Sequence, residues 1–232
     1  MMMPSMCKKV VVFDLDDTLY KEIDFLKSGY RKVAELVEKR FHFPANDVYY
    51  NLLSWYSRGE NAFEKLNEKY RLDNPISDYL NVYRFHQPNM ALTDDARETL
   101  IELKKTGVLM GIITDGREET QKNKIEALGL SEWINTDLII INEEQKCFKP
   151  NHWGFDRIMI KCFDKNIEAD AEFFYVGDNI EKDFIAPNEL GWISVCLLDD
   201  GKNIHKQSFD FPKECLPQYK IDSIIDLLEI IR

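Results

Sequence analysis

Three aspartates directly follow a short apolar run near the start of the chain. The run is Val10 to Phe13, and the acids are Asp14, Asp16 and Asp17. A β-branched run without alternation predicts a buried strand of a parallel sheet, and such sheets bind ligands beyond the carboxyl ends of their strands. Carboxylates crowded at that point repel one another and lose hydration, so a cation is needed to hold them together. Oxygen ligands alone favour magnesium, and we expect Mg²⁺ here.

Further polar side chains follow later apolar segments. In chain order they are Thr114, Asp115, Lys149, Asp178 and Asp183. Because parallel strands share one carboxyl edge, we expect all of these side chains to gather near the first acidic cluster. A carboxylate can approach an anionic phosphate ester only if positive charge offsets the repulsion, and Mg²⁺ together with the lysine would supply that charge.

The order and spacing of these residues resembles the four sequence motifs of the haloacid dehalogenase superfamily, whose members are mostly phosphatases. The resemblance begins at Asp14-x-Asp16-x-Thr18 and extends to about Leu198. It implies that Asp14 attacks phosphorus and forms an aspartyl-phosphate. It also implies that Asp16 protonates the leaving alcohol and then activates the water that hydrolyses the intermediate.

The same resemblance assigns the remaining residues. Thr114, Asp115 and Lys149 would bind the phosphoryl group, with Thr114 and Lys149 also counted as catalytic. Magnesium would be held by Asp14, Asp178 and the backbone carbonyl of Asp16. Asp183 would lie close by, either as a ligand through water or as a group that orients the ligands.

Together these features predict a magnesium-dependent phosphomonoester hydrolase that acts on a small phosphorylated metabolite. Dehalogenation is disfavoured, because the dehalogenase branch of the superfamily has no carboxylate at the position of Asp16. A phosphomutase of the same superfamily stays open, since mutases carry the same two aspartates. A phospho-accepting signalling receiver is a third reading, but receivers are usually about half this length and lack a helical insertion after the first strand.

Each residue also has an ordinary structural explanation when it is taken alone. Thr114 could be the N-cap of the following helix, and Lys149 before a proline could lie in a surface turn. Asp178 could belong to an ordinary strand-to-helix loop. Asp17 should point away from its neighbours and serve a structural role, and the segment Gly201-Lys202-Asn203 is expected to be a turn, because it lacks the flanking residues of a phosphate-binding loop.

After residue 93 the sequence predicts strands that alternate with helices. Apolar runs predict strands, and stretches with helical periodicity predict the helices between them, with a closing helix at 221–231. The strands are expected at 10–13, 108–113, 138–141, 173–176 and 192–198. This alternation predicts an α/β fold with a doubly wound parallel sheet, a Rossmann-like core.

The segment 21–90 shows helical periodicity and no strand-like apolar run. Leu26, Tyr30, Val33 and Val37 recur at helical spacing, and similar stretches follow at 48–56, 62–70 and 76–85. We therefore expect residues 1–20 and 91–232 to form the catalytic core and residues 21–90 to form an inserted all-helical cap. The polar loop around Arg58 could extend from this cap over the site, where its guanidinium would bind a second group of the substrate, or it could be a solvated surface turn.

Composition limits the partners. The 232-residue chain carries a formal net charge of −11, which argues against nucleic acid, and no apolar run approaches the length of a membrane span. A small phosphate ester is the expected partner, and the protein is expected to be either a monomer or a homodimer. Five cysteines without a CxxC pair and a start that lacks a signal-peptide core predict a cytoplasmic protein.

Overall fold

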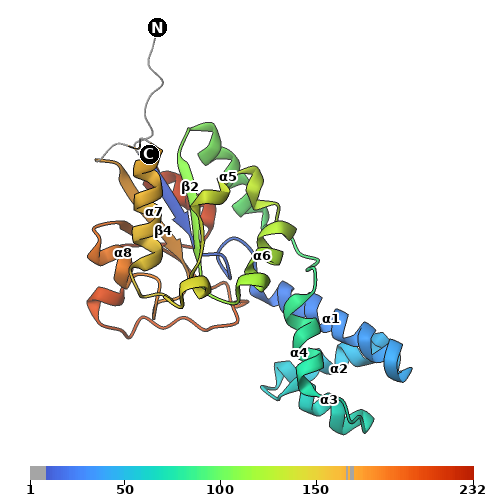
Figure 1. The fold of residues 1–232 in the computed structure, drawn as a ribbon. Helices are drawn as coiled ribbons and strands as arrows, with labels where there is room; N and C mark the ends of the chain where they lie inside the picture. The colour runs from blue at the N-terminus through green and yellow to red at the C-terminus, as the bar shows by residue number, and fades with distance from the viewer. Residues whose placement is uncertain (1–8, 166, 168–169) are drawn as a thin grey trace.

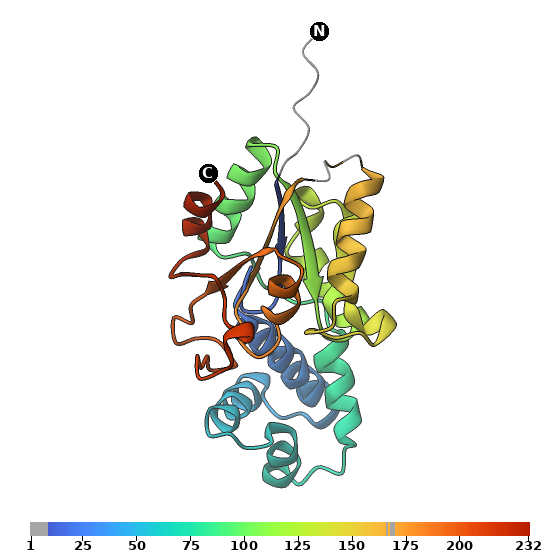
Figure 2. The same ribbon diagram turned by 90° about the vertical axis from the view of Figure 1, so that its left-hand side faces the viewer.

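The computed structural model describes residues 9–165, 167 and 170–232. A six-stranded parallel sheet with helices on both faces forms one part of the molecule, and four helices project from one end of it (Figures 1 and 2). The strands are β1 (Lys9–Phe13), β2 (Leu109–Thr114), β3 (Ile139–Ile141), β4 (Glu172–Gly177), β5 (Ile193–Leu197) and β6 (Tyr219–Ile221). The helices are α1 (Glu22–Phe41), α2 (Ala45–Ser57), α3 (Ala62–Tyr70), α4 (Ile76–Phe85), α5 (Asp94–Lys105), α6 (Glu118–Ala127), α7 (Trp153–Asp164), α8 (Ile185–Glu189) and α9 (Leu227–Ile231).

The strand order is β3-β2-β1-β4-β5-β6, and every neighbouring pair is parallel. This is the order of a Rossmann-type sheet, in which the direction of winding reverses between β1 and β4. Val11 of β1 lies opposite Met110 of β2 on one side and Phe174 of β4 on the other. The predicted α/β fold is confirmed, and a crevice is expected where β1 and β4 end.

The central strand separates two apolar layers. Val11 and Phe13 pack with residues of α5 and α9, whereas Val10 and Val12 pack with residues of α7 and α8. All four side chains are fully buried. Because successive side chains of a strand point to opposite faces, a strand covered by helices on both sides must be apolar throughout.

Helices α1 to α4 pack around an apolar cluster of their own. Leu26, Val33 and Val37 of α1 meet Leu52 of α2 and Leu66 of α3, all of them buried. The first of these helices begins right after the acidic turn, and α4 returns the chain to the sheet (Figure 1). We call α1–α4 the helical segment.

The predicted strands agree with β1 to β5 within one residue at each end, but the carboxyl end of the chain differs from the prediction. Instead of one helix over 221–231, the chain forms the edge strand β6, a single 3-10 turn at Ile224–Asp226 and the short helix α9. The Ser223 side chain accepts a hydrogen bond from the backbone of Ile225, and the helical turn starts at Ile224, three residues later than predicted. The prediction of an eleven-residue helix here is therefore wrong.

No helix within the described part of the chain is long and apolar enough to cross a membrane. No disulfide joins the cysteines among the described residues, and Cys7 lies outside them.

Candidate active site

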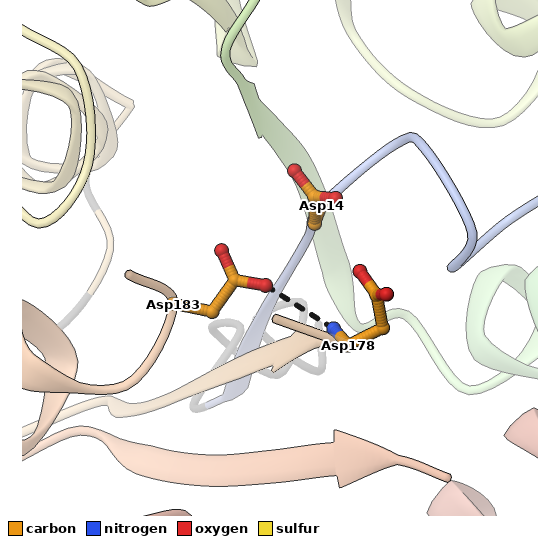
Figure 3. A group of neighbouring side chains, drawn as sticks. All are labelled: Asp14, Asp178 and Asp183. Atoms are coloured by element: carbon orange, nitrogen blue, oxygen red, sulfur yellow. Dashed lines mark hydrogen bonds between the residues drawn. The ribbon is translucent and has the colours of Figure 1, made fainter. Parts of the chain in front are cut away.

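Three buried carboxylates meet where β1 and β4 end. Oxygen atoms of Asp14, Asp178 and Asp183 all lie within 4.8 Å of one another (Figure 3). Asp14 follows β1, Asp178 follows β4, and Asp183 comes from the loop before α8. The structure thus brings together three of the predicted metal ligands at the point where the winding of the sheet reverses.

The backbone holds Asp183 in place. Its Oδ2 atom accepts hydrogen bonds from the backbone N–H groups of Asp178, at 3.1 Å, and Asn179, at 2.9 Å. The carboxylate lies so close to Gly177 that a Cβ atom at that position would be 2.5 Å from Oδ2. A glycine at the end of β4 is therefore needed to let this carboxylate approach the strand.

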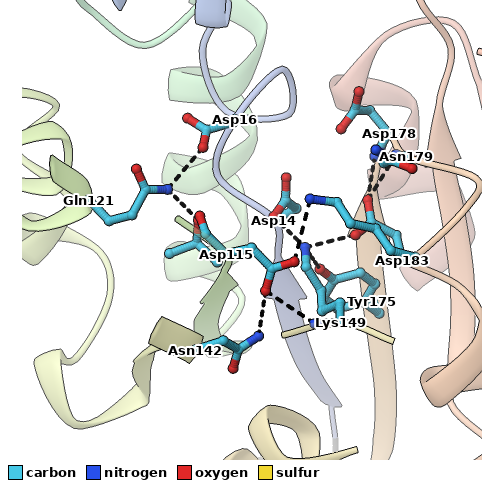
Figure 4. A network of polar contacts seen from close by, with 12 residues as sticks. Asp14, Asp16, Asp115, Gln121, Asn142, Lys149, Tyr175, Asp178, Asn179 and Asp183 are labelled. Carbon is cyan, nitrogen blue, oxygen red and sulfur yellow. Dashed lines mark hydrogen bonds and ion pairs between the residues drawn. The ribbon is translucent and has the colours of Figure 1, made fainter. Parts of the chain in front are cut away.

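Lys149 is the cation of this cluster. Its ammonium group lies 2.5 Å from Oδ1 of Asp14, 2.7 Å from Oδ1 of Asp183 and 2.8 Å from the hydroxyl of Tyr175 (Figure 4). None of the lysine side chain is exposed. The interpretation of Lys149 as a surface turn residue is wrong, because a buried ammonium group is tolerated only where carboxylates surround it.

Negative charge in this cluster exceeds positive charge. Burial, opposed by Lys149, raises the pKa of Asp14 to about 7. Burial and the neighbouring carboxylates Asp183 and Asp14 raise the pKa of Asp178 to about 9. Burial opposes the charge of Lys149, but attraction to Asp14 and Asp183 outweighs it and holds the pKa of the lysine well above its usual range. Hard oxygen ligands that lack a counter-charge fit a divalent cation such as Mg²⁺.

The carboxylate of Asp16 points toward α6 and away from this cluster. Oδ1 accepts hydrogen bonds from Nζ of Lys124, at 2.7 Å, and from the hydroxyl of Tyr20, and Oδ2 accepts one from Nε2 of Gln121 at 2.9 Å (Figure 4). Burial opposes ionisation, but Lys124 and the hydrogen bonds outweigh it and lower the pKa of Asp16. Its side chain is not part of the group of carboxylates formed by Asp14, Asp178 and Asp183.

Thr114 ends β2 beside the acidic cluster, and Asp115 follows it. The Thr114 hydroxyl accepts a hydrogen bond from Gln121 at 2.6 Å and is fully buried. It does not cap α6, whose N-cap residue is Arg117. Asp115 accepts hydrogen bonds from the side chain of Asn142, at 2.8 Å, and from the backbone of Lys149, at 3.2 Å, and so ties the lysine loop to β2.

A cavity of about 320 Å³ opens above these residues. Its volume is at the small end of the range for ligand pockets. Residues from both parts of the molecule line it, among them Asp14, Asp178 and Lys182 from the core and Glu22, Phe25 and Arg84 from the helical segment. Lys149 and Thr114 lie behind this lining, in contact with Asp14 and Gln121 respectively.

The loop after β5 also reaches the site. The side-chain amide of Asn203 donates a hydrogen bond to Oδ2 of Asp178 at 3.0 Å, and Asp199 accepts hydrogen bonds from the backbone of Gly201 and Asn203. The expected turn is therefore present. Asp17 accepts hydrogen bonds from the backbone of Glu22 and Ile204, so it links this loop to the start of α1, in agreement with the structural role predicted for it.

Arg58 is the predicted site residue that the structure does not bring to the cavity. Its guanidinium binds Oε2 of Glu60, at 2.7 Å and 3.0 Å, and the hydroxyl of Ser54, at 2.7 Å, within its own loop. Half of the arginine side chain is exposed, and it is not among the residues that line the cavity. In this arrangement the guanidinium is bound within its own loop, and its contact with a substrate stays a prediction.

Sequence reasoning missed Gln121, Lys124 and Lys182. Gln121 and Lys124 are buried, although both are polar and lie one turn apart on α6. The mostly polar sequence of α6 was a usable signal, because a helix packed on a sheet normally presents apolar residues there. Lys182, 3.4 Å from Asp115, gave no signal of this kind, since it lies in a loop rich in charged residues.

Comparison with known proteins agrees with this geometry. The family model described as haloacid dehalogenase-like hydrolase matches residues 11–196. A glyceraldehyde 3-phosphate phosphatase of Methanocaldococcus jannaschii is 28% identical over an alignment of 238 positions that covers 97% of each chain. A ribulose-1,5-bisphosphate 5-phosphatase of Halopiger xanaduensis is 29% identical over 143 residues, covering 61% of this chain and 57% of the relative.

Among solved structures, the hydrolase YfnB of Bacillus subtilis, bound to magnesium, is similar with a TM-score of 0.65 at 19% identity. The similarity covers 97% of this chain and 99% of YfnB, and at that identity it shows the fold alone. The family model spans most of the chain, from β1 to β5. It therefore includes Asp14, Asp178 and Asp183, the carboxylates that meet where β1 and β4 end. The chain belongs to the haloacid dehalogenase-like hydrolases.

Proposed function

We propose that this phosphoric monoester hydrolase cleaves a small phosphorylated metabolite through an aspartyl-phosphate formed on Asp14. The observation that carries the proposal is the position of Asp14, which lines the cavity on one side and contacts buried Lys149 on the other. The carboxylate is thereby held at the site where a phosphoryl group would enter. Lys149 and Lys182 supply positive charge for an anionic substrate.

Asp14, Asp178 and the backbone of Asp16 would hold Mg²⁺, with Asp183 in contact with Lys149 beside them. When bound, the ion would offset the negative charge of the phosphoryl group. Asp16 would transfer the proton to the leaving alcohol and later accept one from water, and this requires its carboxylate to turn from Lys124 toward the substrate. Thr114 and Asp115 would orient the phosphoryl group from the end of β2.

We further propose that residues 21–90 form a cap over the catalytic core formed by residues 1–20 and 91–232. Support comes from the separate apolar cluster of the helical segment and from Glu22, Phe25 and Arg84, which line the leaving-group side of the cavity. Relatives that match over nearly the whole chain are named glyceraldehyde 3-phosphate phosphatases, so triose phosphates are the first substrates to test. A cytoplasmic location stays a prediction from the cysteine content.

A phosphate-release screen over a panel of phosphomonoesters tests the proposal. Release should require Mg²⁺, stop in excess EDTA and be abolished by Asp14→Asn, because an amide is a poor nucleophile. Analysis of sugar phosphate substrates for isomers separates hydrolysis from mutase activity. Continued hydrolysis by a pure Asp14→Asn preparation would refute the mechanism.

A further inference from the structure

Two arginines that line the cavity have no acidic partner within the described part of the chain. Arg84 comes from the last turn of α4 and Arg117 immediately precedes α6, and both line the cavity. Among the described residues, neither guanidinium makes an ion pair or a hydrogen bond. The other two long cations that line the cavity are paired, Lys124 with Asp16 at 2.7 Å and Lys182 with Asp115 at 3.4 Å.

Contacts between α6 and the end of α4 hold these arginines at the cavity. The hydroxyl of Thr120 on α6 donates a hydrogen bond to the carbonyl of Arg84, at 3.1 Å. The side-chain amide of Asn123, also on α6, lies 3.4 Å from the carbonyl of His86, just beyond the end of α4. The end of α4 is thus docked on the same helix that Arg117 precedes, so both arginines border one region of the cavity.

The chemistry at Asp14 does not need this charge. Lys149 contacts Asp14 and Lys182 lines the cavity, the carboxylates around Asp14 would add a divalent cation, and Asp16 has Lys124. Arginine presents a fork of donors that matches carboxylate and phosphate oxygens and stays charged at any working pH. Phe25 and Tyr83, an edge-to-face aromatic pair, line the cavity beside Arg84 and lower the local dielectric, which strengthens attraction to an anion.

Building on the proposed function, we propose that Arg84 and Arg117 bind a second anionic group of the substrate, remote from the phosphoester. The preferred substrate is then a phosphorylated acid or a bisphosphate rather than a phosphate ester with an uncharged tail. Carboxylate and phosphate share the oxygens that an arginine fork recognises, and the experiment separates them.

Steady-state phosphate release with three substrates of one chain length tests this proposal. They are 3-phosphoglycerate, glyceraldehyde 3-phosphate and glycerol 3-phosphate, which differ at the end remote from the phosphate. A second arm compares ribulose 1,5-bisphosphate with ribulose 5-phosphate. We expect kcat/KM to favour the member with the second anion in at least one arm, and that arm identifies the group as carboxylate or phosphate.

Arg84→Ala and Arg117→Ala should each lower kcat/KM for the favoured anionic substrate about 10- to 100-fold, the effect of one lost charge-assisted hydrogen bond. The uncharged-tail partner should change less than about 2-fold, because it offers nothing to the guanidinium. Arg84→Lys should fall in between, since it keeps the charge but not the fork. Arg157→Ala is the matched control, because Arg157, like Arg117, is exposed and without a partner among the described residues but lies on α7, outside the cavity.

Equal losses on anionic and uncharged substrates, or no preference in either arm, would overturn the proposal while leaving the hydrolase function intact. If no phosphomonoester is hydrolysed with Mg²⁺, the proposed function fails, and the second-anion site fails with it. Thermal melts of each variant exclude a folding defect as the cause of any loss.

Discussion

Replacing Lys149 by methionine tests how the buried charges of this site are balanced. The substitution keeps most of the side-chain volume but removes an ammonium group that lies 2.5 Å from Asp14 and 2.7 Å from Asp183, with none of the lysine exposed. Removing one partner of a buried ion pair costs about 3–5 kcal/mol, since the remaining charge is left uncompensated. For a chain of this size each kcal/mol lowers the melting temperature by about 2–4 °C, so a fall of about 6–20 °C is expected.

Protonation of Asp14 limits this loss and makes it depend on pH. The pKa of Asp14 is already raised to about 7 with the lysine present, and removing the lysine raises it further. A raised pKa in the folded state means that the repulsion is present above that pKa and disappears as pH falls through it. The difference in melting temperature between the two proteins should therefore be largest near pH 8 and shrink toward pH 5.5.

The assay is a thermal melt by circular dichroism, in EDTA and in millimolar Mg²⁺, at several pH values. Because the variant has lost its internal cation, Mg²⁺ should raise its melting temperature more than that of the native protein. Lys146→Met is the control, because Lys146 is exposed and three residues upstream in the same loop. If Lys149→Met melted within about 2 °C of the native protein in EDTA at pH 8, the argument from a buried, compensating lysine would be refuted.

Three further perturbations test other parts of the site. Asp16→Asn should slow turnover of alkyl phosphates by about 100- to 10,000-fold, while an activated aryl phosphate still forms a phosphoenzyme that an acid quench detects; native alkyl turnover would contradict the acid–base role. Gly177→Ala should cost about 1–3 kcal/mol in urea unfolding and raise the Mg²⁺ concentration needed for activity, because its Cβ would lie 2.5 Å from Asp183; unchanged magnesium dependence would argue against this close approach. Burial lowers the pKa of His86, so the native protein should lose stability as pH falls from about 6.5 toward that lower value, and His86→Gln should flatten this slope in urea titrations at pH 5 to 7.

The core of the fold could be predicted because its strands are buried on both faces. Val10 to Phe13 is buried on both faces, so it is apolar throughout, and this run alone predicts a central parallel strand. Parallel strands then bring Asp14, Thr114 and Asp178 to one edge, although up to 164 residues separate the first from the last. The edge strand β6 was missed, because Tyr219 and Lys220 are exposed and three residues carry no pattern.

The side chains that surround the reacting groups were harder to predict. Which partner a buried carboxylate chooses depends on helix placement, and Asp16 binds Lys124 108 residues away. Arg58, in contrast, binds partners that are close in the sequence. Ser54 and Glu60 lie within four residues of it and could have been identified as partners from the loop sequence. Local pairing competes with any distant substrate contact, and the nearer partner has the smaller entropic cost of closure.

The position of Lys124 connects the chemistry at Asp16 with the placement of the helical segment. Its ammonium group lies 2.7 Å from Asp16, 3.9 Å from Glu22 and 4.5 Å from the ring centre of Phe25. The latter two belong to the first turn of α1, whereas Lys124 and Gln121 belong to α6 of the core. A displacement of α1 would therefore change the charge and the aromatic surface around Lys124, whereas Gln121, which binds the other oxygen of Asp16, belongs to the core. Because the attraction between two charges strengthens as water and competing charges leave, the hold of Lys124 on Asp16 depends on where α1 lies. Helix α6 thus holds both oxygens of Asp16, the predicted acid–base group. Gln121 binds Oδ2 from within the core, whereas the bond from Lys124 to Oδ1 depends on the position of the helical segment.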